Sequence, residues 1–185
     1  MKTPAPLPHF QSRVVPVVVV TDPAQAVPMA EALLAGGVDV IEITLRSAAG
    51  LAAIEAVARA VPAMQVGAGT VTRACEVAQV MAAGARFALS PGSTPALISA
   101  VLDAGLPFIP GVGTPSEAMA MRDAGFTLMK CFPAAQLGGV EVLKAWGGPL
   151  PDLRFCPTGG VSLANMAQFL ALPNVAMVGG SWLTP

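Results

Sequence analysis

The feature that most constrains the fold of this chain is a repeating unit: an Ala-rich stretch, a glycine and a short apolar run. The unit reads AEALLAGGVDVIEI, MAAGARFALS, LDAGLPFIPG and RDAGFTLMKC in four places. Gly37, Gly84, Gly105 and Gly125 stand where the glycine that ends a helix is expected. Helices that alternate with strands in this way predict right-handed crossovers and a parallel sheet.

Counting these units gives the expected elements. The pattern predicts eight strands, near residues 14–20, 38–45, 65–69, 86–90, 107–111, 126–131, 154–158 and 175–179. Seven helices are expected between them, near residues 23–35, 48–60, 73–83, 94–104, 115–124, 138–146 and 162–171. We therefore predict one α/β domain over residues 1–185, a (β/α)8 TIM barrel lacking its final C-terminal helix, with an irregular N-terminal segment at residues 1–12. The alternative is an open doubly wound sheet, which usually has a glycine-rich loop where this chain has VTDPAQA.

Composition limits the partners that the chain can have. It is 54% hydrophobic and only 11% charged, with a net charge of -1, whereas charged residues usually make up about 25%. No apolar run approaches the roughly 18 residues that a membrane span needs, and no basic stripe is present for nucleic acid. The short run VVPVVVV contains a proline and is a poor signal peptide. We expect a cytoplasmic protein without nucleic-acid or membrane partners and with a buried subunit interface.

Cysteine and histidine are too few for several common kinds of site. Cys75, Cys131 and Cys156 are odd in number and widely spaced, which indicates neither a disulfide framework nor a zinc site. His9, the single histidine, lies in the Pro-rich start TPAPLPHF. A catalytic triad built on histidine and a multi-histidine metal site are therefore not expected.

The stretch VDVIEITLR, at residues 38–46, carries polar side chains on one face of an otherwise apolar strand. Side chains alternate between the two faces of a strand, so Glu42, Thr44 and Arg46 point the same way. In a barrel, the carboxyl ends of the strands carry the chemistry. Arg46 offers a planar fork for a carboxylate, and Glu42 could relay protons. A purely structural ion cluster is the other interpretation.

Lys130 lies within the apolar sequence FTLMKCFP, in the expected sixth strand. Burial disfavours a charged amine, and a neutral amine can attack a ketone to form a Schiff base. A structural salt bridge to Glu42 explains the same position. Lys144, on an expected helix, is most simply exposed to solvent.

Paired glycines follow the last two expected strands. They stand in PTGG at residues 157–160 and in GGSW at residues 179–182. The loops after strands seven and eight of such barrels often bind phosphate through backbone N–H groups. Tight turns would also explain the glycines, but their occurrence at both adjacent ends favours a phosphate site.

In this order and spacing, EITLR, GAGTV, SPG, MKCFPA, RFCPTGGV and VGGSWL closely resemble the 2-keto-3-deoxy-6-phosphogluconate (KDPG) aldolase family of class I pyruvate aldolases. The resemblance implies Lys130 as the Schiff-base lysine and Glu42 as the acid/base. It also implies a homotrimeric lyase that needs no metal and no cofactor and that cleaves KDPG to pyruvate and glyceraldehyde 3-phosphate. By the same resemblance, Arg46 and Thr70 bind the carboxylate, and the substrate-binding set is Arg46, Thr70, Pro91, Phe132, Thr158, Gly159, Gly160, Gly179, Gly180 and Ser181.

Three alternatives stay open at this point. Related aldolases for 4-hydroxy-2-oxoglutarate or for 2-keto-3-deoxy-6-phosphogalactonate share the lysine and the glutamate, and a barrel scaffold or assembly subunit would need neither. Members of the family continue into a final helix, whereas this chain stops at SWLTP. Either the sequence is truncated, or the chain is less stable than its relatives, with apolar surface of the first and last strands uncovered.

Overall fold

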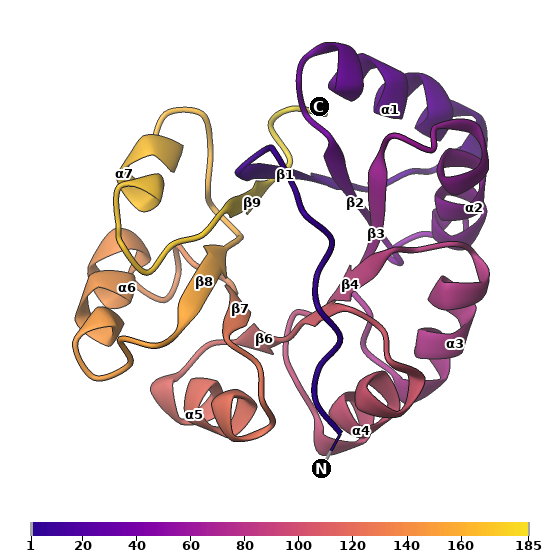
Figure 1. Cartoon of the computed structure of the whole chain (residues 1–185). Helices are drawn as coiled ribbons and strands as arrows, with labels where there is room; N and C mark the ends of the chain where they lie inside the picture. Colours follow the sequence, from indigo (N-terminus) through magenta and orange to yellow (C-terminus); the bar gives the residue numbers. More distant parts are fainter. Residues whose placement is uncertain (1, 185) are drawn as a thin grey trace.

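The computed structural model describes residues 2–184, and its strands lie inside a ring of helices (Figure 1). The strands are β1 (Val14–Val18), β2 (Val40–Thr44), β3 (Gln65–Gly69), β4 (Phe87–Leu89), β5 (Phe108–Ile109), β6 (Gly111–Val112), β7 (Leu128–Cys131), β8 (Arg154–Pro157) and β9 (Val178–Gly180). The helices are the short 3-10 helix η1 (Pro23–Gln25) and α1 (Ala26–Ala35), α2 (Gly50–Ala60), α3 (Ala74–Ala82), α4 (Pro95–Ala104), α5 (Pro115–Asp123), α6 (Gly139–Gly147) and α7 (Met166–Leu170). The predicted α/β alternation is confirmed.

All the strand pairs are parallel, and the strands are arranged in two sheets that together form a curled wall. One sheet has the order β5-β4-β3-β2-β1-β9 and the other β6-β7-β8. Only Pro110 separates β5 from β6, and an isolated bridge joins Thr158 to Gly179 in β9. Both sheets therefore belong to one curled arrangement, although the ladder of hydrogen bonds is divided.

The division falls within the single strand that the sequence predicted at residues 107–111. Proline has no N–H to donate to a ladder, and the N–H of Gly111 donates to Ser90 Oγ (3.0 Å) instead of to a backbone carbonyl. The prediction of an uninterrupted fifth strand was wrong, because the chain changes its pairing partner from β4 to β7 at Pro110.

Local signals account for the ends of the helices. Thr114 Oγ1 accepts a hydrogen bond from the N–H of Glu117 (3.2 Å), and the Glu117 carboxylate accepts from the N–H of Thr114 (3.0 Å), which forms a capping box before α5. The four glycines predicted to end helices all have positive φ, for example 68° at Gly105 after α4. The glycine pattern thus marked helix ends correctly.

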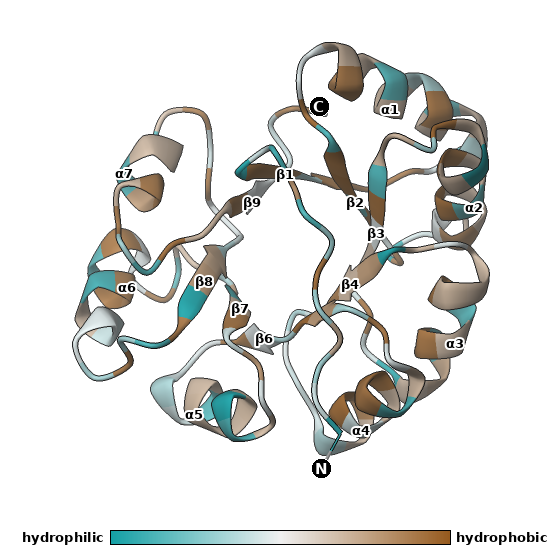
Figure 2. Cartoon of the chain, viewed as in Figure 1, coloured by the Kyte–Doolittle hydropathy of each residue, from teal (hydrophilic) through white to brown (hydrophobic). Residues whose placement is uncertain are grey.

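Two apolar clusters cover the two faces of the strands. Ile41 and Ile43 of β2 pack into the larger cluster with residues such as Ile54 and Val57 of α2, between strands and helices. In Figure 2 the helices carry both apolar and hydrophilic segments, as expected of helices with one face on a core. The smaller cluster, here called the inner cluster, lies on the opposite face of the strands and consists of Val15, Val40, Phe87, Leu89 and Ile109.

Residues 2–13, here called the N-terminal strap, contain no helix or strand but pack against the rest of the chain. Leu7 and Phe10 contact the inner cluster, and the Phe10 ring centroid lies 4.9 Å from that of Phe87. In Figure 1 the strap runs across the ring of strands. The backbone of the strap is irregular, yet its apolar side chains close the amino end of the curled sheet.

Asp39 fixes the end of the strap. Its carboxylate accepts hydrogen bonds from the N–H groups of Gln11 (2.9 Å) and Ser12 (3.0 Å). Partial burial alone would raise the pKa of Asp39, but these backbone hydrogen bonds outweigh it and lower the pKa below its usual range. The strap is thereby held to the loop that precedes β2.

The carboxyl-terminal part differs from one expectation. Within residues 2–184 no α-helix follows β9, yet Val15 to Val18 of β1 and all of β9 are buried. The expectation that these strands expose apolar surface is met only at their ends, because the inner cluster covers Val15 and the Trp182 ring folds back against Gly180. Only the flanking Val19 and Leu183 are exposed there. No helix in the described part of the chain is long and apolar enough to cross a membrane.

Candidate active site

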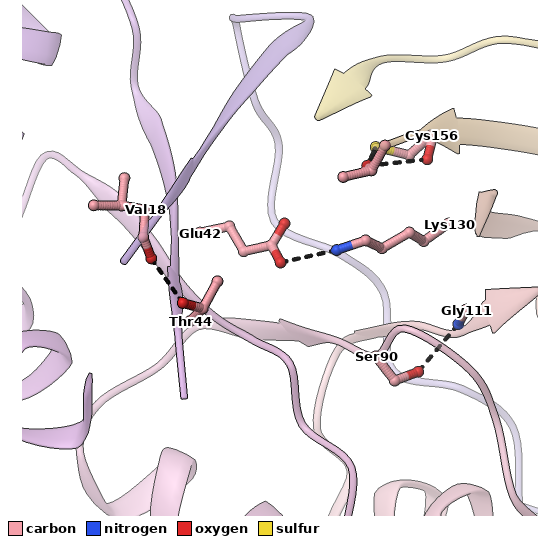
Figure 3. Close-up of polar contacts among 8 residues, drawn as sticks. Val18, Glu42, Thr44, Ser90, Gly111, Lys130 and Cys156 are labelled. Carbon is pink, nitrogen blue, oxygen red and sulfur yellow. Dashed lines mark hydrogen bonds and ion pairs between the residues drawn. The ribbon is translucent and has the colours of Figure 1, made fainter. Parts of the chain in front are cut away.

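A buried ion pair joins two strands from different sheets. Lys130 Nζ of β7 lies 3.0 Å from Glu42 Oε1 of β2, and the two side chains are 4% and 1% exposed. Figure 3 shows the side chains pointing toward one another across the space that the strands enclose. The other carboxylate oxygen, Glu42 Oε2, is buried and accepts no hydrogen bond from the described residues. The pair thus combines an amine with a carboxylate that has one oxygen free for another partner.

The polar row on β2 is shorter than the sequence suggested. Thr44, like Glu42, is buried, and its hydroxyl donates to the carbonyl of Val18 (2.9 Å). The strand ends there, and Arg46 lies in the following turn as an exposed residue. Arg46 is therefore not on the strand.

A cavity of about 550 Å³ opens at the carboxyl ends of β1, β8 and β9. Phe132, which lines it, connects the cavity with the ion pair, because Lys130 Nζ lies 5.6 Å from the Phe132 ring centroid. This distance is within the range of a cation–π contact. The cavity brings together seven of the predicted substrate-binding residues: Arg46, Phe132, Thr158, Gly159, Gly160, Gly180 and Ser181.

Three predicted residues lie outside the cavity lining. Thr70 follows β3 and has a φ of 60°, a left-handed conformation that is costly for a β-branched residue. Pro91 lies in the bend after β4. Gly179 lies within β9, where a Cβ would strike the side chain of Thr158. Thr70 and Pro91 thus occupy neighbouring strand ends, and Gly179 provides space for a residue of the cavity.

The sequence left two explanations for the glycines after β8, a tight turn and a phosphate site made of backbone N–H groups. The loop has features of both. Gly159 and Gly160 have φ values of 91° and 78°. The carbonyl of Gly159 accepts from the N–H of Ala135 (3.0 Å), so the loop is a fixed turn. Among the described residues, however, the N–H groups of Gly159 and Gly160 donate to no backbone acceptor. The turn therefore leaves two donors beside the cavity.

The thiols near the ion pair are poor nucleophiles. Burial raises the pKa of Cys156 to about 12, although the nearby positive charge of Lys130 acts in the opposite direction. Burial likewise raises the pKa of Cys131 to about 12. Both thiols stay protonated near neutral pH, and only a thiolate is strongly nucleophilic. Neither thiol is thus a strong nucleophile near the ion pair.

Sequence reasoning missed several polar side chains. Thr21 and Gln25 line the cavity next to β1, and the rule that places chemistry at strand ends could have found Thr21 in VTDPAQ. Ser90, fully buried after β4, gave no signal because its role depends on Gly111. No group of three or more His, Cys, Asp or Glu residues that could hold a metal occurs within residues 2–184.

Comparison with known proteins gives a consistent result. Residues 9–185 match the family of KDPG and KHG aldolases. The chain is 53% identical over 175 residues to a 2-dehydro-3-deoxy-phosphogluconate aldolase of Pseudoalteromonas atlantica, covering 95% of this chain and 81% of that protein. It is 51% identical over 172 residues to the KHG/KDPG aldolase of Escherichia coli, covering 93% and 81%.

A solved structure agrees with these sequence matches. The KDPG aldolase of Legionella pneumophila, captured with pyruvate as a covalent carbinolamine intermediate, superposes with a TM-score of 0.92 at 46% identity. The superposition covers 94% of this chain and 84% of that one. On the match of nearly the whole sequence and on this likeness of fold, the chain belongs to the KDPG and KHG aldolase family.

Proposed function

We propose that this chain is a class I aldolase that cleaves 2-keto-3-deoxy-6-phosphogluconate to pyruvate and glyceraldehyde 3-phosphate. The observation that carries the proposal is the buried Lys130–Glu42 pair beside the cavity. The family consists of aldolases, which are carbon–carbon lyases, and relatives that bear the KDPG aldolase name are about half identical to this chain.

The first half of the reaction forms the covalent intermediate. A proton that moves along the 3.0 Å contact from Lys130 Nζ to Glu42 Oε1 leaves a neutral amine and a carboxylic acid. The amine attacks the C2 ketone to give a carbinolamine, which loses water to form an iminium. The carbinolamine trapped in the Legionella relative is an intermediate of this kind and supports the step.

The second half breaks the carbon–carbon bond. Glu42 accepts the proton of the C4 hydroxyl, directly or through a water, while the C3–C4 electron pair moves toward the iminium nitrogen. The aldehyde leaves, and an enamine remains on Lys130. Protonation of the enamine at C3 and hydrolysis of the resulting imine then release pyruvate and restore the amine. The iminium acts as the electron sink.

Substrate binding divides between the two ends of the site. We assign the pyruvate carboxylate to Arg46 and Thr70, with Pro91 and Phe132 as further substrate contacts. The strained backbone of Thr70 supports this assignment, because such strain concentrates at functional sites. The phosphate is assigned to the two glycine loops, with Thr158, Gly159, Gly160, Gly179, Gly180 and Ser181; the free N–H groups of Gly159 and Gly160 support this.

A second substrate is favoured by one comparison. The Escherichia coli relative is named KHG/KDPG aldolase, so that protein is associated with two substrates. We propose 4-hydroxy-2-oxoglutarate as the alternative substrate of this chain. It carries no phosphate, so it would use the ion pair and Arg46 without the glycine loops.

The finer features of the assembly follow from the same proposal. We infer a single domain in which the two sheets form one (β/α)8 barrel, supported by the continuity of β5 and β6 through Pro110 and by the Thr158 bridge to Gly179. A homotrimer in the cytoplasm that needs no cofactor remains our expectation. Analytical ultracentrifugation of the purified chain tests the trimer.

Trapping with borohydride tests the covalent step. Pyruvate followed by borohydride should reduce the imine on Lys130 to a stable secondary amine, because Lys130 alone among the lysines has a buried carboxylate partner. Peptide mass mapping should then find the adduct on Lys130 and not on the exposed Lys144. An adduct on Lys144, or none in the folded protein, would remove Lys130 from its role.

Substitution of Ser181 tests the phosphate assignment. Ser181 lines the cavity and is exposed, so a larger side chain fits there without disturbing the core. Ser181→Asp places a negative charge where a dianion is proposed, and we expect kcat/KM for KDPG to fall by about 10²-fold, because like charges repel. Ser181→Asn, of nearly the same shape, is the matched control and should cost much less.

The unphosphorylated substrate completes this test. Cleavage of 4-hydroxy-2-oxoglutarate should change little in Ser181→Asp. Equal losses with both substrates would mean that the loop after β9 shapes the cavity without binding phosphate. Circular dichroism of both variants checks that the fold is unchanged.

A further inference from the structure

Two glycines on β3 lie beside β2, the strand that carries Glu42. Gly67 and Gly69 are two residues apart and therefore lie on the same face of the strand. They pair in register with Glu42 and Thr44 of β2. Glycine within a strand is destabilising by roughly 0.5–1 kcal/mol relative to alanine, and it often marks a close approach of another group. The two positions therefore call for a steric explanation.

The explanation differs between the two glycines. A Cβ at Gly67 would overlap the Phe87 ring, so Gly67 serves the packing of the inner cluster. A Cβ at Gly69 would lie 2.5 Å from Glu42 Cγ and 2.7 Å from Glu42 Cδ, and closest of all to Oε1. Oε1 is the atom that accepts the hydrogen bond from Lys130 Nζ. Gly69 thus leaves room for the carboxylate at the position from which it reaches the amine in this structure.

Few other contacts hold that carboxylate. Lys130 is its hydrogen-bond donor among the described residues, and Oε2 has none. During the proposed reaction Lys130 becomes an imine and keeps at most one N–H. The carboxylate then depends on the surface beside it, and the backbone of Gly69 forms that surface.

We propose that Gly69 is a positioning residue that sets the location of the Glu42 carboxylate for proton transfer to and from the substrate. The inference rests on the proposed function, because that function makes Glu42 the acid/base. It concerns the placement of the carboxylate, which accepts a proton from Lys130 in the first half of the proposed reaction and from the substrate in the second. A methyl group at Gly69 should therefore impair cleavage more than the capture of pyruvate, because cleavage requires both halves and capture only the first.

Gly69→Ala is a clean probe of this idea. The φ of Gly69 is not in the left-handed region, so alanine fits the backbone without strain. The three atoms nearest to the added methyl group, Cγ, Cδ and Oε1, all belong to the Glu42 side chain and not to backbone, so the substitution acts on that side chain. Gly148→Ala is the matched control, because Gly148 is exposed, has negative φ and leaves a new Cβ in open space.

The decisive measurement is a double-mutant cycle with Glu42→Ala, which removes the side chain that the methyl group would strike. In the native background, Gly69→Ala should lower kcat for KDPG cleavage by about 10²-fold, as expected for a catalytic group misplaced by about 1 Å. Borohydride trapping of pyruvate on Lys130 should be slower than in the native protein but should still go to completion, because the methyl group leaves the amine in place. In the Glu42→Ala background, Gly69→Ala should change kcat by less than about threefold, because the two changes act on one contact.

Three results would overturn the proposal: native-like cleavage by Gly69→Ala, the same fold loss in both backgrounds, or a failure of both the single and the double variant to fold. If the single variant fails to fold and the double variant folds, the conflict with Glu42 is demonstrated and the proposal stands.

The unmodified chain is assayed first. Absence of a pyruvate adduct or of cleavage there would refute the proposed function itself, whereas an active native chain with an additive cycle would refute only the role of Gly69.

Discussion

Lys130→Met is expected to reduce KDPG cleavage by on the order of 10⁵-fold or more, the scale seen when a covalent catalyst loses its nucleophile. Methionine keeps the length of the side chain but has no amine, so neither the carbinolamine nor the imine can form. The neighbouring thiols do not substitute for it, because burial keeps Cys156 and Cys131 protonated. Pyruvate release, followed continuously with a coupled reductase, measures the loss.

The same substitution also affects stability, and the two effects must be separated. Removing Lys130 leaves Glu42 as a buried charge without a partner, a change that typically costs about 3–5 kcal/mol of unfolding free energy. Lys130→Met/Glu42→Gln removes the stranded charge and should recover stability without recovering activity. Lys144→Met, the same change at an exposed lysine of α6, is the matched control and should keep native turnover. Substantial cleavage by a folded Lys130→Met protein would exclude the Schiff-base mechanism.

Glu42→Gln is expected to lower kcat by 10²- to 10⁴-fold, the usual loss when a general acid/base is removed. Glutamine preserves the shape that fits against Gly69, and its carbonyl can still accept a hydrogen bond from Lys130. Lys130 should therefore still be trapped by pyruvate and borohydride, while carbon–carbon cleavage is slow. Steady-state cleavage and the extent of trapping, measured on the same sample, distinguish these steps.

The control for this variant is Glu55→Gln on α2. Glu55 is 62% exposed and pairs with Arg59 only at 3.8 Å, so its neutralisation should leave turnover unchanged. If Glu42→Gln retained near-native turnover, Glu42 would be a structural partner of Lys130, as the simplest sequence interpretation allowed. If trapping were lost as completely as cleavage, Glu42 would be required mainly for forming the imine.

The sequence was informative where short-range rules operate. The signals for helix ends lie within a few residues of those ends. They are the glycines that end helices and the threonine and proline that begin α4 and α5, and the helices therefore lie close to their predicted ranges. The polar row of VDVIEITLR identified Glu42 because strand periodicity is strict. Lys130 was suggested by its apolar surroundings, yet only the folded chain brings its amine to 3.0 Å from Glu42.

The features that were missed depend on contacts between distant parts of the chain. The division of the sheet at Pro110 requires Ser90 to take the N–H of Gly111. The packing of the N-terminal strap requires the inner cluster to exist. The tasks of Gly67 and Gly69 depend on Phe87 and Glu42, which approach them only in the folded state. None of these partners can be chosen from local sequence alone.

The strap is synthesised before the strands that it packs against. Phe10 leaves the ribosome before any of its partners, because Phe87 and Ile109 of the inner cluster are made much later. Chains are synthesised from the amino terminus at about 5–20 residues per second, so several seconds pass between the synthesis of Phe10 and that of Ile109, and during this time these partners cannot bury the apolar side chains of the strap. It docks only when β4 and β5 are in place. A segment that precedes the strands in the chain can thus take its final place only after β4 and β5 have been made, and its docking covers the amino end of the curled sheet.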